Sequence, residues 1–298
     1  PTAASGIREL ARLRKSPLNA SMPDNTEQLT LGVEQLTLGV EQQMPRSTKG
    51  IKAVLNENTV FQTEGIRYSG SKRTLIPFIA EAIKGLPIRT ALDGFTGTTR
   101  VAQYFKKAGF SVHANDLALY SSVFARCYLL NNDTSPRGIK DKLDHLNSLQ
   151  PVEGFYTENY GGDDDGAGNV VAKDGKKKPF QRKNAMKLDA IRPEIDRIAE
   201  NETEKAILLT SLILGLDKIE NTLGHQVAYL AQWASRSYDD LVLELPSLIK
   251  GTKEYSCTQQ DVATLQGEWD LAYFDPPYNT NNTVTVTTRV RYASYYHF

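Results

Sequence analysis

TALDGFTGTTRVAQYFKKAGFSVHAND, residues 90–116, sets the fold class, because strand and helix signals alternate along it. Residues 90–93 are a short apolar run that predicts a strand ending at an acid and a glycine loop. Apolar side chains then recur at helical spacing over residues 101–108. Residues 111–116 predict a second strand, and residues 117–130 predict a second helix. This order is typical of an α/β protein with a parallel sheet covered on both faces.

A further strand is predicted close to the end of the chain. Residues 271–274, LAYF, form an apolar run that ends at Asp275 and indicates another buried parallel strand. In open α/β sheets, ligands bind outside the carboxyl ends of strands, near the point where the strand order reverses. Asp93 and Asp275 each end such a strand, so we expect both acids to face one crevice.

The middle of the chain, about residues 132–249, interrupts this pattern. Its residues 161–178 are rich in Gly, Asp and Lys and predict a mobile loop. Helices are expected over about residues 183–198 and 203–233, and strand-like texture returns at residues 241–245, LVLEL. An insertion between sheet elements is a suitable place for a specificity module.

Residues 1–50 differ from the rest of the chain and predict a flexible leader. They contain EQLTLGV twice in tandem, at residues 27–40, and two copies are too few for a solenoid. The basic residues 6–16 could instead form a short amphipathic helix that contacts DNA. The sequence begins on Pro, and Met22 and Met44 are both possible starts.

Composition indicates a globular protein of 298 residues, of which 40% are hydrophobic. Lys and Arg together number 35, as do Asp and Glu, so net charge offers no argument for a nucleic-acid partner. Cys127 and Cys257 fit neither a disulfide framework nor a metal site and are expected to be buried thiols in a reduced compartment. The longest apolar run, residues 206–216, is too short to span a bilayer and predicts a core helix. We therefore expect no membrane partner and, without a preceding secretory signal, a cytoplasmic location.

The DPPY sequence after the last predicted strand suits a planar group that carries an amino substituent. Pro276 and Pro277 fix the turn and lack N–H donors. Asp275 and the Pro276 carbonyl offer two acceptors, and Tyr278 offers a ring for stacking. Acceptors that hold the hydrogens of an amino group can free the lone pair of its nitrogen. A nucleobase in a duplex would have to flip out to reach such a pocket; the simpler alternative is a turn after a strand.

Two features mark the carboxyl ends of the first two predicted strands. Gly94 and Gly97 let the backbone approach a ligand closely. Asp116 is placed to accept hydrogen bonds from ribose hydroxyls, or to cap the helix that follows, or to do both. The acids at residues 163–165 lack the ligand spacing of a calcium loop, so solvated acids, and no metal, are expected there.

With these residues, the chain resembles the Dam-like (D12-class) DNA adenine methyltransferases, which use S-adenosylmethionine. The resemblance covers residues 65–298 and implies a Rossmann-like methyltransferase sheet with an inserted, largely helical target-recognition region. It assigns residues 51–131 to the cofactor-binding part, 132–249 to the insert, and 250–298 to the catalytic strand and the start of the C-terminal part. In the family, further strands follow the catalytic strand, so C-terminal strands are expected to be missing from a sequence that stops at Phe298.

The resemblance also implies roles for single residues. Residues 66–79 are similar to the family's N-terminal cofactor motif, and LDGFTGTTR is similar to its methionine-binding loop. Gly94 and Thr99 stand where the family usually has Pro and Gly, which predicts a less tightly wound loop. Asp116 matches the ribose-binding acid, and Asp261 matches the acid that holds the cofactor's adenine. The residues expected to bind the cofactor are Tyr68, Gly70, Lys72, Asp93, Phe95, Gly97, Asp116, Asp261 and Val262. The residues expected to be catalytic are Asp275, Pro276, Pro277 and Tyr278, and Arg67 is expected to contact DNA.

The function implied is methyl transfer from S-adenosylmethionine to the exocyclic amino group of a flipped-out adenine, by the modification enzyme of a restriction–modification system. Double-stranded DNA is the expected partner, together with a cognate restriction endonuclease that acts on the same site. GLDKIENTLGHQVAYL, residues 215–230, is also similar to a helical stretch of the family. His225 within it is as well explained by a structural role as by a DNA contact, so it is left out of the site.

Two alternatives stay open. The amino group could belong to RNA adenine, cytosine or a protein glutamine, although Asp275 favours DNA adenine because those enzymes more often carry Asn or Ser. The chain could also be a truncated, non-catalytic fragment that binds cofactor or DNA. Within the insert, Lys176 to Lys178 are expected to meet phosphates or solvent. No physical code converts these residues into a DNA recognition sequence.

Overall fold

The computed structural model describes residues 59–67, 71–222 and 229–276. The predicted leader, its repeat and its helix therefore lie outside the described residues, as does His225. The chain divides into two compact units. Of the described residues, 59–64, 71–132 and 249–276 belong to the first unit, which we call the sheet unit. Residues 65–67, 133–222 and 229–248 belong to the second, which we call the helical unit.

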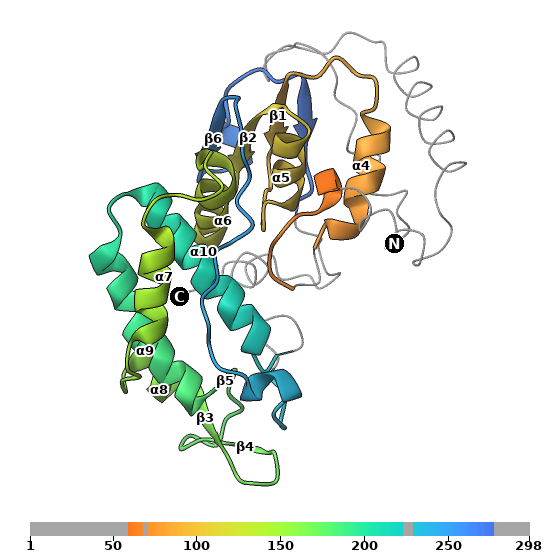
Figure 1. The fold of residues 1–298 in the computed structure, drawn as a ribbon. Helices are drawn as coiled ribbons and strands as arrows, with labels where there is room; N and C mark the ends of the chain where they lie inside the picture. The colour runs from red at the N-terminus through yellow and green to blue at the C-terminus, as the bar shows by residue number, and fades with distance from the viewer. Residues whose placement is uncertain (1–58, 68–70, 223–228, 277–298) are drawn as a thin grey trace. The chain divides into compact units, whose positions relative to one another are not determined.

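In the described part of the chain, the sheet unit contains a four-stranded parallel sheet with the strand order β6–β2–β1–β7 (Figure 1). Its strands are β1 (Thr90–Asp93), β2 (Ser111–Asn115), β6 (Tyr255–Thr258) and β7 (Leu271–Tyr273). Its α-helices are α4 (Ile76–Ala82), α5 (Arg100–Lys107) and α6 (Leu119–Ala125). Shorter helical elements are η1 (Thr59–Phe61), η2 (Arg73–Leu75), the π-helix η3 (Arg126–Leu130) and η5 (Val262–Thr264). The α/β fold with a parallel sheet is therefore confirmed.

The core of the sheet unit explains why residues 90–116 form these elements. Ala91 and Leu92 are both buried although they point to opposite faces of β1, as expected for a parallel strand covered on both sides. On α5, the apolar stripe that includes Val101 and Phe105 is buried in the same core as residues of β2 and β7. Helical periodicity and strand burial thus identify the same hydrophobic core.

Strand β6 was not predicted, because it carries little apolar signal. Tyr255 and Cys257 pack against the core, whereas Ser256 and Thr258 alternate with them. β6 lies at the edge of the described sheet and pairs with β2 alone there. β6 packs one face, that of Tyr255 and Cys257, against the core, so a period-two pattern in a short polar segment was the available clue.

The predicted helix over residues 117–130 begins at Leu119 and ends in the π-helix η3. A buried lysine binds the carbonyl groups at that end of the helix. Lys106, on α5, donates from Nζ to the carbonyls of Tyr128, Leu129 and Asn131 at 2.7–2.9 Å. The same ammonium lies 4.5 Å from the ring centroid of Tyr255 on β6. Burial lowers the pKa of Lys106 to about 8, so at neutral pH a largely charged donor satisfies the last carbonyls of the helix.

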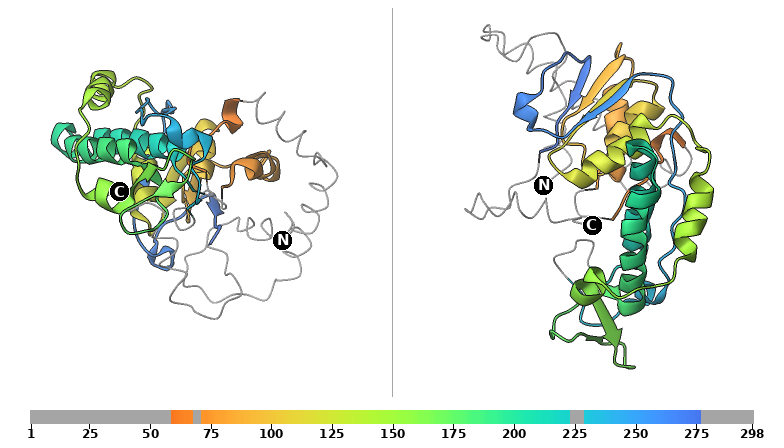
Figure 2. Two further views of the ribbon diagram at one scale, coloured as in Figure 1. Left: turned by 90° about the horizontal axis from the view of Figure 1, so that it is seen from below. Right: turned by 90° about the vertical axis from the view of Figure 1, so that its left-hand side faces the viewer.

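The helical unit is built around two long helices. Its helices are α7 (Ile139–Ser148), α8 (Phe155–Tyr160), α9 (Arg182–Ile198), α10 (Glu202–Ile219) and the short η4 (Ser235–Tyr238). Its strands are β3 (Gly161–Asp164), β4 (Val170–Val171) and β5 (Phe180–Gln181). α9 and α10 pack against each other, and α7 packs against both (Figure 2). The helix predicted at 183–198 and the core helix at 206–216 are confirmed.

The loop predicted for residues 161–178 is wrong where two strands form. In the described part of the chain these residues contribute β3 and β4 to a three-stranded sheet of order β4–β3–β5. Asp164 Oδ1 accepts the backbone N–H groups of Gly166 and Gly168, and Asp165 Oδ1 accepts those of Ala167 and Asn169. Acids expected to be merely solvated therefore fix the turn between β3 and β4.

The helix predicted to run from 203 to 233 is also wrong in its second half, because α10 ends at Ile219. Glu220 is extended, and the backbone N–H of Asn221 donates to the Pro179 carbonyl. Thr222 then pairs with Tyr229 across residues 223–228. The chain leaves the helix because partners distant in sequence take up its backbone groups.

LVLEL, residues 241–245, does not form a strand. Burial alternates from Leu241 to Glu244, but Leu245, which would share a strand face with Leu241 and Leu243, is exposed. The backbone partners, however, are helix side chains. Leu241 N–H donates to Asn184 Oδ1, and Asn147 accepts from the N–H of Leu243 and donates to its carbonyl. Burial periodicity alone cannot tell a strand from an extended segment that lies on helices.

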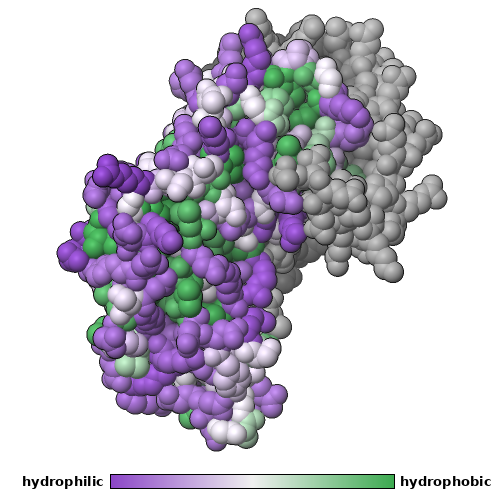
Figure 3. Space-filling model, viewed as in Figure 1, coloured by the Kyte–Doolittle hydropathy of each residue, from purple (hydrophilic) through white to green (hydrophobic). Residues whose placement is uncertain are grey.

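Two predictions concern membrane-spanning helices and the burial of the cysteines. Among the described residues, no helix is long and apolar enough to cross a membrane. Cys127 is fully buried, as predicted, whereas Cys257 is only half-buried. On the face seen in Figure 3, hydrophobic residues lie in separate groups among hydrophilic ones.

Candidate active site

Three carboxylates follow the carboxyl ends of neighbouring strands in the sheet unit. Asp93 is the last residue of β1, Asp116 follows β2, and Asp275 comes two residues after β7. The sheet places β2 on one side of β1 and β7 on the other, so the strand order reverses at β1. Open α/β sheets bind their ligands at this position, outside the carboxyl ends of the strands.

Asp93 is a buried acid, and only one of its two carboxylate oxygens accepts hydrogen bonds. Its side chain is 1% exposed, and Oδ2 accepts from the Thr96 hydroxyl at 2.9 Å and from the Ala102 backbone N–H at 3.1 Å. Oδ1 is buried without a hydrogen-bond partner. Burial raises the pKa of Asp93 to about 7, and the charge of Asp116 adds to the effect. A buried carboxylate with an unused acceptor is suited to a cationic donor.

Lys72 brings the acids of β1 and β7 together. Its ammonium forms an ion pair with Asp275 Oδ2, and the two side chains are 15% and 12% exposed. Burial lowers the pKa of Lys72, and the nearby charge of Asp93 opposes that shift. Lys72, which the resemblance placed among the cofactor-binding residues, thus contacts the acid expected to be catalytic.

The glycine loop between β1 and α5 is tied to both neighbouring strands. Gly94 N–H donates to the Tyr273 carbonyl at 2.9 Å, and Thr96 N–H donates to the Asn115 carbonyl at 2.9 Å. Gly97 has a φ of 50° and donates its N–H to Asp116 Oδ2 at 2.8 Å. These bonds fix the loop above the ends of β7 and β2.

The expected loosening of this loop at Thr99 does not occur. Thr99 has a φ of 61° and a ψ of 12°, the left-handed conformation that glycine adopts readily. Its hydroxyl donates to the Thr98 carbonyl at 2.7 Å and accepts from Gln103 Nε2 at 3.0 Å. Local hydrogen bonds hold a β-branched residue in a strained conformation, so the tight turn into α5 is kept.

Gly94, the other departure from the family pattern, is explained by a neighbouring ring. A Cβ built on Gly94 would lie 2.6 Å from two ring carbons of Phe274 and 3.3 Å from Val262 Cγ2. The ring of Phe274 also meets Phe95 edge-on, with centroids 6.4 Å apart. Gly94 is therefore required by the aromatic ring that precedes Asp275.

Asp116 uses both carboxylate oxygens within the protein. Besides Gly97, it accepts the N–H of Ala118 at 2.9 Å through Oδ1. The N-cap position of α6 is occupied by Ala118, so Asp116 forms a turn ahead of the helix and is not its N-cap. Each carboxylate oxygen can accept a further bond, so the role expected toward ribose hydroxyls stays a prediction.

Asp261 also has a local structural role. It is exposed, and its Oδ1 accepts the N–H of Ala263 at 3.0 Å as the N-cap of η5. Val262, beside it, contacts the position that a Gly94 side chain would occupy. The predicted contact of Asp261 with adenine is neither supported nor opposed by these bonds.

Sequence reasoning missed Asn115, which joins the site's loops. This residue is 2% exposed, and its Nδ2 donates to the carbonyls of Gly94 and Gln260. Its Oδ1 accepts from the Thr258 hydroxyl at 2.8 Å and from Gln260 N–H at 3.3 Å. The available clue in the sequence was a polar residue at a buried strand position, directly before Asp116.

In the helical unit, two predicted DNA contacts have different surroundings. Arg67 has a side chain that is 51% exposed, and it pairs with Asp217. Lys178 is wrong as a phosphate contact, because its side chain is only 5% exposed. Its Nζ donates to the Asn159 carbonyl and to Asp174 Oδ2. Lys176 and Lys177 are exposed, as expected.

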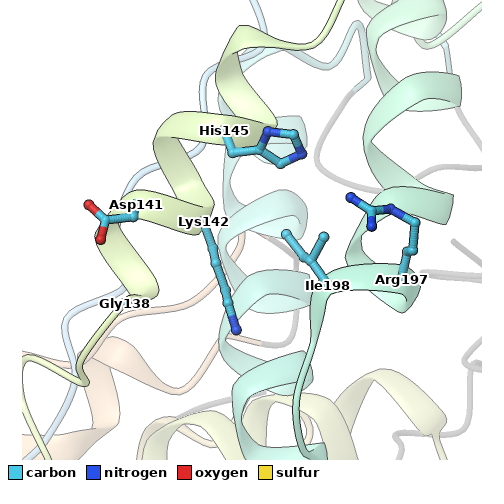
Figure 4. Close-up of a pocket in the computed structure, with 6 residues that line it drawn as sticks. All are labelled: Gly138, Asp141, Lys142, His145, Arg197 and Ile198. Atoms are coloured by element: carbon cyan, nitrogen blue, oxygen red, sulfur yellow. The ribbon is translucent and has the colours of Figure 1, made fainter.

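A pocket of roughly 440 Å³ lies in the helical unit and is lined by charged residues (Figure 4). Lys142 and His145 project into it from α7, and Arg197 comes from the end of α9. These groups are already paired: His145 and Arg197 with Glu194, and Lys142 with Glu200 and Glu204. The pocket is lined by an internal charge network, with none of the predicted site residues among its walls.

Four of the predicted site residues, Tyr68, Gly70, Pro277 and Tyr278, lie outside the described residues. Pro276 is described and half-buried. Among the described residues, no group of three His, Cys, Asp or Glu side chains could hold a metal ion. The described site therefore consists of acids, one lysine and a glycine loop at the carboxyl edge of the sheet.

Comparisons with known proteins agree with this arrangement. The family described as "D12 class N6 adenine-specific DNA methyltransferase" matches residues 68–297. Modification methylase StsI of Streptococcus sanguinis is 30% identical over 250 residues, which cover 78% of this chain and 35% of that protein. Modification methylase LlaI of Lactococcus lactis subsp. lactis is 29% identical over 76% of this chain and 38% of that protein. Type II methyltransferase M.NlaIII of Neisseria lactamica is 29% identical over 72% of this chain and 64% of that protein.

The aligned part of this chain thus spans between 35% and 64% of the length of these relatives. No solved structure matches the chain significantly. The family match nonetheless covers most of the sequence, and it takes in Lys72, Asp93 and Asp275, which the fold gathers at the carboxyl edge of the sheet. The chain belongs to the D12 class N6 adenine-specific DNA methyltransferases.

Proposed function

We propose that this chain acts as a site-specific DNA adenine methyltransferase, the modification enzyme of a restriction–modification system. The methyl group would move from S-adenosylmethionine to the exocyclic amino group of a flipped-out adenine. The observation that carries the proposal is the Asp275 carboxylate, paired with Lys72 at the point where the strand order reverses. The names of the relatives, which are modification methylases, support the same class of reaction.

The sheet unit has groups that fit S-adenosylmethionine. The unpartnered Oδ1 of Asp93 suits a cationic amino group, and Asp116 keeps acceptor capacity for ribose hydroxyls. Gly97, with a φ of 50° and no side chain, would let the backbone approach the cofactor at the same edge. We propose that Tyr68, Gly70, Lys72, Asp93, Phe95, Gly97, Asp116, Asp261 and Val262 bind the cofactor. When bound, the cofactor supplies a methyl group made electrophilic by its positively charged sulfur.

Asp275 would accept a hydrogen bond from the adenine amino group, and the Pro276 carbonyl would accept a second. Two acceptors shift electron density toward the nitrogen, which favours attack in the transition state. In the transfer, the amino nitrogen would gain the methyl group that the bound cofactor supplies, the sulfur would keep the bonding electron pair, and the nitrogen would pass one proton to solvent water. Pro277 and Tyr278 complete the proposed motif, with the Tyr278 ring stacked on the flipped base.

The proposed partners are double-stranded DNA and a cognate restriction endonuclease that acts on the same site. The insert, about residues 132–249, is proposed as the target-recognition region, and Arg67 as a contact to DNA. We propose a cytoplasmic location, since the two cysteines of the sequence match no disulfide framework.

The test is methyl transfer by the full chain with methyl-labelled cofactor and, in separate reactions, duplex DNA, RNA or protein. Label is expected in DNA as N6-methyladenine, and sequencing of the modified DNA would give the recognition site. Asp275→Ala is expected to abolish transfer while cofactor binding largely survives. Glu268→Ala, which removes an exposed carboxylate ahead of β7 and outside the insert, is the control and should retain activity. Full activity of Asp275→Ala, or label in RNA or protein alone, would overturn the proposal.

A further inference from the structure

Asn115, the last residue of β2, is a buried amide that bonds two different loops at the carboxyl edge of the sheet unit. Its Nδ2 donates to the Gly94 carbonyl at 3.3 Å and to the Gln260 carbonyl at 3.1 Å. Its Oδ1 accepts the backbone N–H of Gln260 at 3.3 Å. One side chain therefore holds the glycine loop that follows β1 and both backbone groups of a residue in the loop that follows β6.

The partners of Asn115 allow only one orientation of its amide. The carbonyls of Gly94 and Gln260 can only accept, so they must face the NH₂ group. The backbone N–H of Gln260 can only donate, so it must face Oδ1. The Thr258 hydroxyl also donates to Oδ1, at 2.8 Å. Asn115 thus uses both donor hydrogens and accepts two bonds, and at 2% exposure water does not compete for them.

A second set of hydrogen bonds fixes the Thr258 hydroxyl itself. Its single hydrogen goes to Asn115, so Nε2 of His113, 3.0 Å away, must donate to the hydroxyl oxygen. The other ring nitrogen, Nδ1, then accepts from the Ser256 hydroxyl at 2.8 Å. Burial lowers the pKa of His113, which favours this neutral form of the ring. The amide of Asn115 is therefore oriented from β6 as well as by the two loops.

The two loops that Asn115 joins carry residues of the proposed cofactor site. Phe95 and Gly97 follow Gly94 in the first loop, and Asp261 and Val262 follow Gln260 in the second. The loops also approach each other beyond the amide, since a Cβ on Gly94 would lie 3.3 Å from Val262 Cγ2. A ligand that contacts both loops therefore depends on the spacing that Asn115 sets between them.

We propose that Asn115 is a positioning residue for the cofactor. It holds residues 94–97 and residues 260–262 at the spacing at which one S-adenosylmethionine molecule contacts both loops. Its hydrogen bonds are used within the protein, so it acts through the loops. Without the amide, the loops would adopt other spacings as well, and cofactor binding would have to order them at a cost in affinity. The inference rests on the proposed function for the identity of the ligand and for the loop residues that contact it.

The first test measures the dissociation constant for S-adenosylmethionine and the steady-state kinetics of the full chain. Asn115→Ala removes all four bonds and should weaken cofactor affinity on the order of tenfold. The KM for the cofactor should rise by a similar factor, while kcat changes much less, because the ion pair of Lys72 with Asp275 keeps both partners. A merely structural role would instead reduce the amount of folded enzyme, which lowers kcat at an unchanged KM. A cofactor affinity equal to the parent's would overturn the inference.

Replacing Thr258 tests whether the orientation of the amide matters. Thr258→Val keeps the size of the side chain but removes the hydroxyl, and should weaken cofactor binding by about threefold. Thr258→Ser keeps the hydroxyl and should bind the cofactor like the parent. Adding Thr258→Val to Asn115→Ala should have little further effect, because the hydroxyl acts through the amide. A full additional loss in the double variant would contradict the role assigned to Asn115.

Asp270→Ala is the matched control for stability. Asp270 directly precedes β7 and accepts the backbone N–H groups of Arg89 and Thr90 at 2.8 and 3.0 Å, so it joins β7 to β1 at the opposite, amino edge of the same sheet. Measured below its melting temperature, this variant should bind S-adenosylmethionine like the parent. The inference fails if it weakens cofactor binding as much as Asn115→Ala does.

The measurements separate this inference from the proposed function. If the parent binds S-adenosylmethionine but transfers no methyl group to DNA, the proposed function fails, whereas the affinities of the Asn115 and Thr258 variants still decide the inference. If the parent methylates DNA and Asn115→Ala binds the cofactor equally well, only the inference fails. A parent without affinity for the cofactor would overturn both.

Discussion

The ammonium of Lys72 is ion-paired with the carboxylate of Asp275, so the acid that follows β7 is held by a cation from a segment about two hundred residues earlier. Both side chains are largely buried, and a charge left alone in such surroundings is costly. The pair thus links the N-terminal part of the sheet unit to the residue expected to hold the substrate's amino group.

Replacing Lys72 tests the importance of this pair. Lys72→Met keeps the length of the side chain but removes the charge, and should lower kcat at least tenfold because Asp275 loses its orienting partner. Removing one partner of a buried pair should also destabilise the protein by about 3 kcal/mol. Steady-state kinetics and chemical denaturation would measure the two effects. Lys84→Met, at an exposed lysine paired with Glu81, is the control; equal kinetics for both variants would contradict the prediction.

Asp93 predicts a specific pH dependence. Its pKa is raised to about 7 by burial, above the usual 3.8, so between these values the folded protein keeps a proton that the unfolded chain has lost. Asp93 therefore lowers the free energy of unfolding as pH rises from about 4 to 7, and adds no further change above pH 7. Asp93→Asn should remove this dependence while its amide oxygen still accepts from Thr96 and Ala102. Denaturation curves of both proteins from pH 5 to 8 would check this, and parallel curves would contradict it.

The same acid should couple cofactor affinity to pH. A cationic group at Oδ1 favours the ionised form of Asp93, so affinity for S-adenosylmethionine should rise as pH increases from 6 to 8. The Asp93→Asn protein should lack that increase and bind more weakly at pH 8. Calorimetric titrations in buffers of different ionisation enthalpy would count the protons released. Identical proton release by the two proteins would exclude Asp93 as the source.

Replacing Thr99 by glycine should destabilise the protein less than replacing its neighbour Thr98 by glycine. The left-handed conformation costs an L-residue roughly 1–2 kcal/mol, and Thr99→Gly relieves it at the loss of two local hydrogen bonds. Its stability should stay within about 1 kcal/mol of the parent's. Thr98→Gly, at a buried position without positive φ, should lose more. Urea denaturation would compare them, and an equal loss in both variants would rule out strain at Thr99.

A smaller side chain at position 274 should compensate for a side chain added at Gly94. Gly94→Ala places a methyl group against the ring and should lower both stability and methyl transfer, because the ring directly precedes Asp275. Combining it with Phe274→Leu should restore part of the loss, since a smaller side chain leaves space for the methyl group. Melting temperatures and initial rates of the single and double variants would reveal the coupling. Additive losses would show that the two positions do not share this space.

The sheet could be predicted because its signals are local. Residues 90–116 carry a strand, a helix and a second strand that share one core, with Ala91, Phe105 and Val112 among its members, and the acids at the strand ends follow from that order. Asn115 could not be found in this way, because its four hydrogen bonds join segments that only the fold brings together. Nor could Lys178, since Asp174 and the Asn159 carbonyl bury a lysine that resembles its exposed neighbours.

The insert was harder to predict for the same physical reason. Residues 241–244 of LVLEL alternate in burial as in a strand, but Asn147 and Asn184 satisfy the backbone there from helices. The acids at residues 163–165 suggested mobility, yet two of them fix a tight turn. In each case a side chain distant in sequence, or a local hydrogen bond, decided between conformations that the sequence pattern allowed equally.

The position of Lys106 bears on how such a protein can acquire different inserts during evolution. Its ammonium bonds the Asn131 carbonyl, just before the chain leaves the sheet unit, and lies on the ring of Tyr255, just after it returns. Gly251 lies there too, since a Cβ on it would be 2.6 Å from Lys106 Cε. The points where the chain leaves and re-enters the sheet unit thus both contact the buried side chain of Lys106. This contact closes the sheet unit independently of the segment inserted between the two points. Inserts of different length and sequence can therefore be exchanged at this junction during evolution without a change in the sheet, and such exchange would alter DNA specificity if the insert is the proposed target-recognition region.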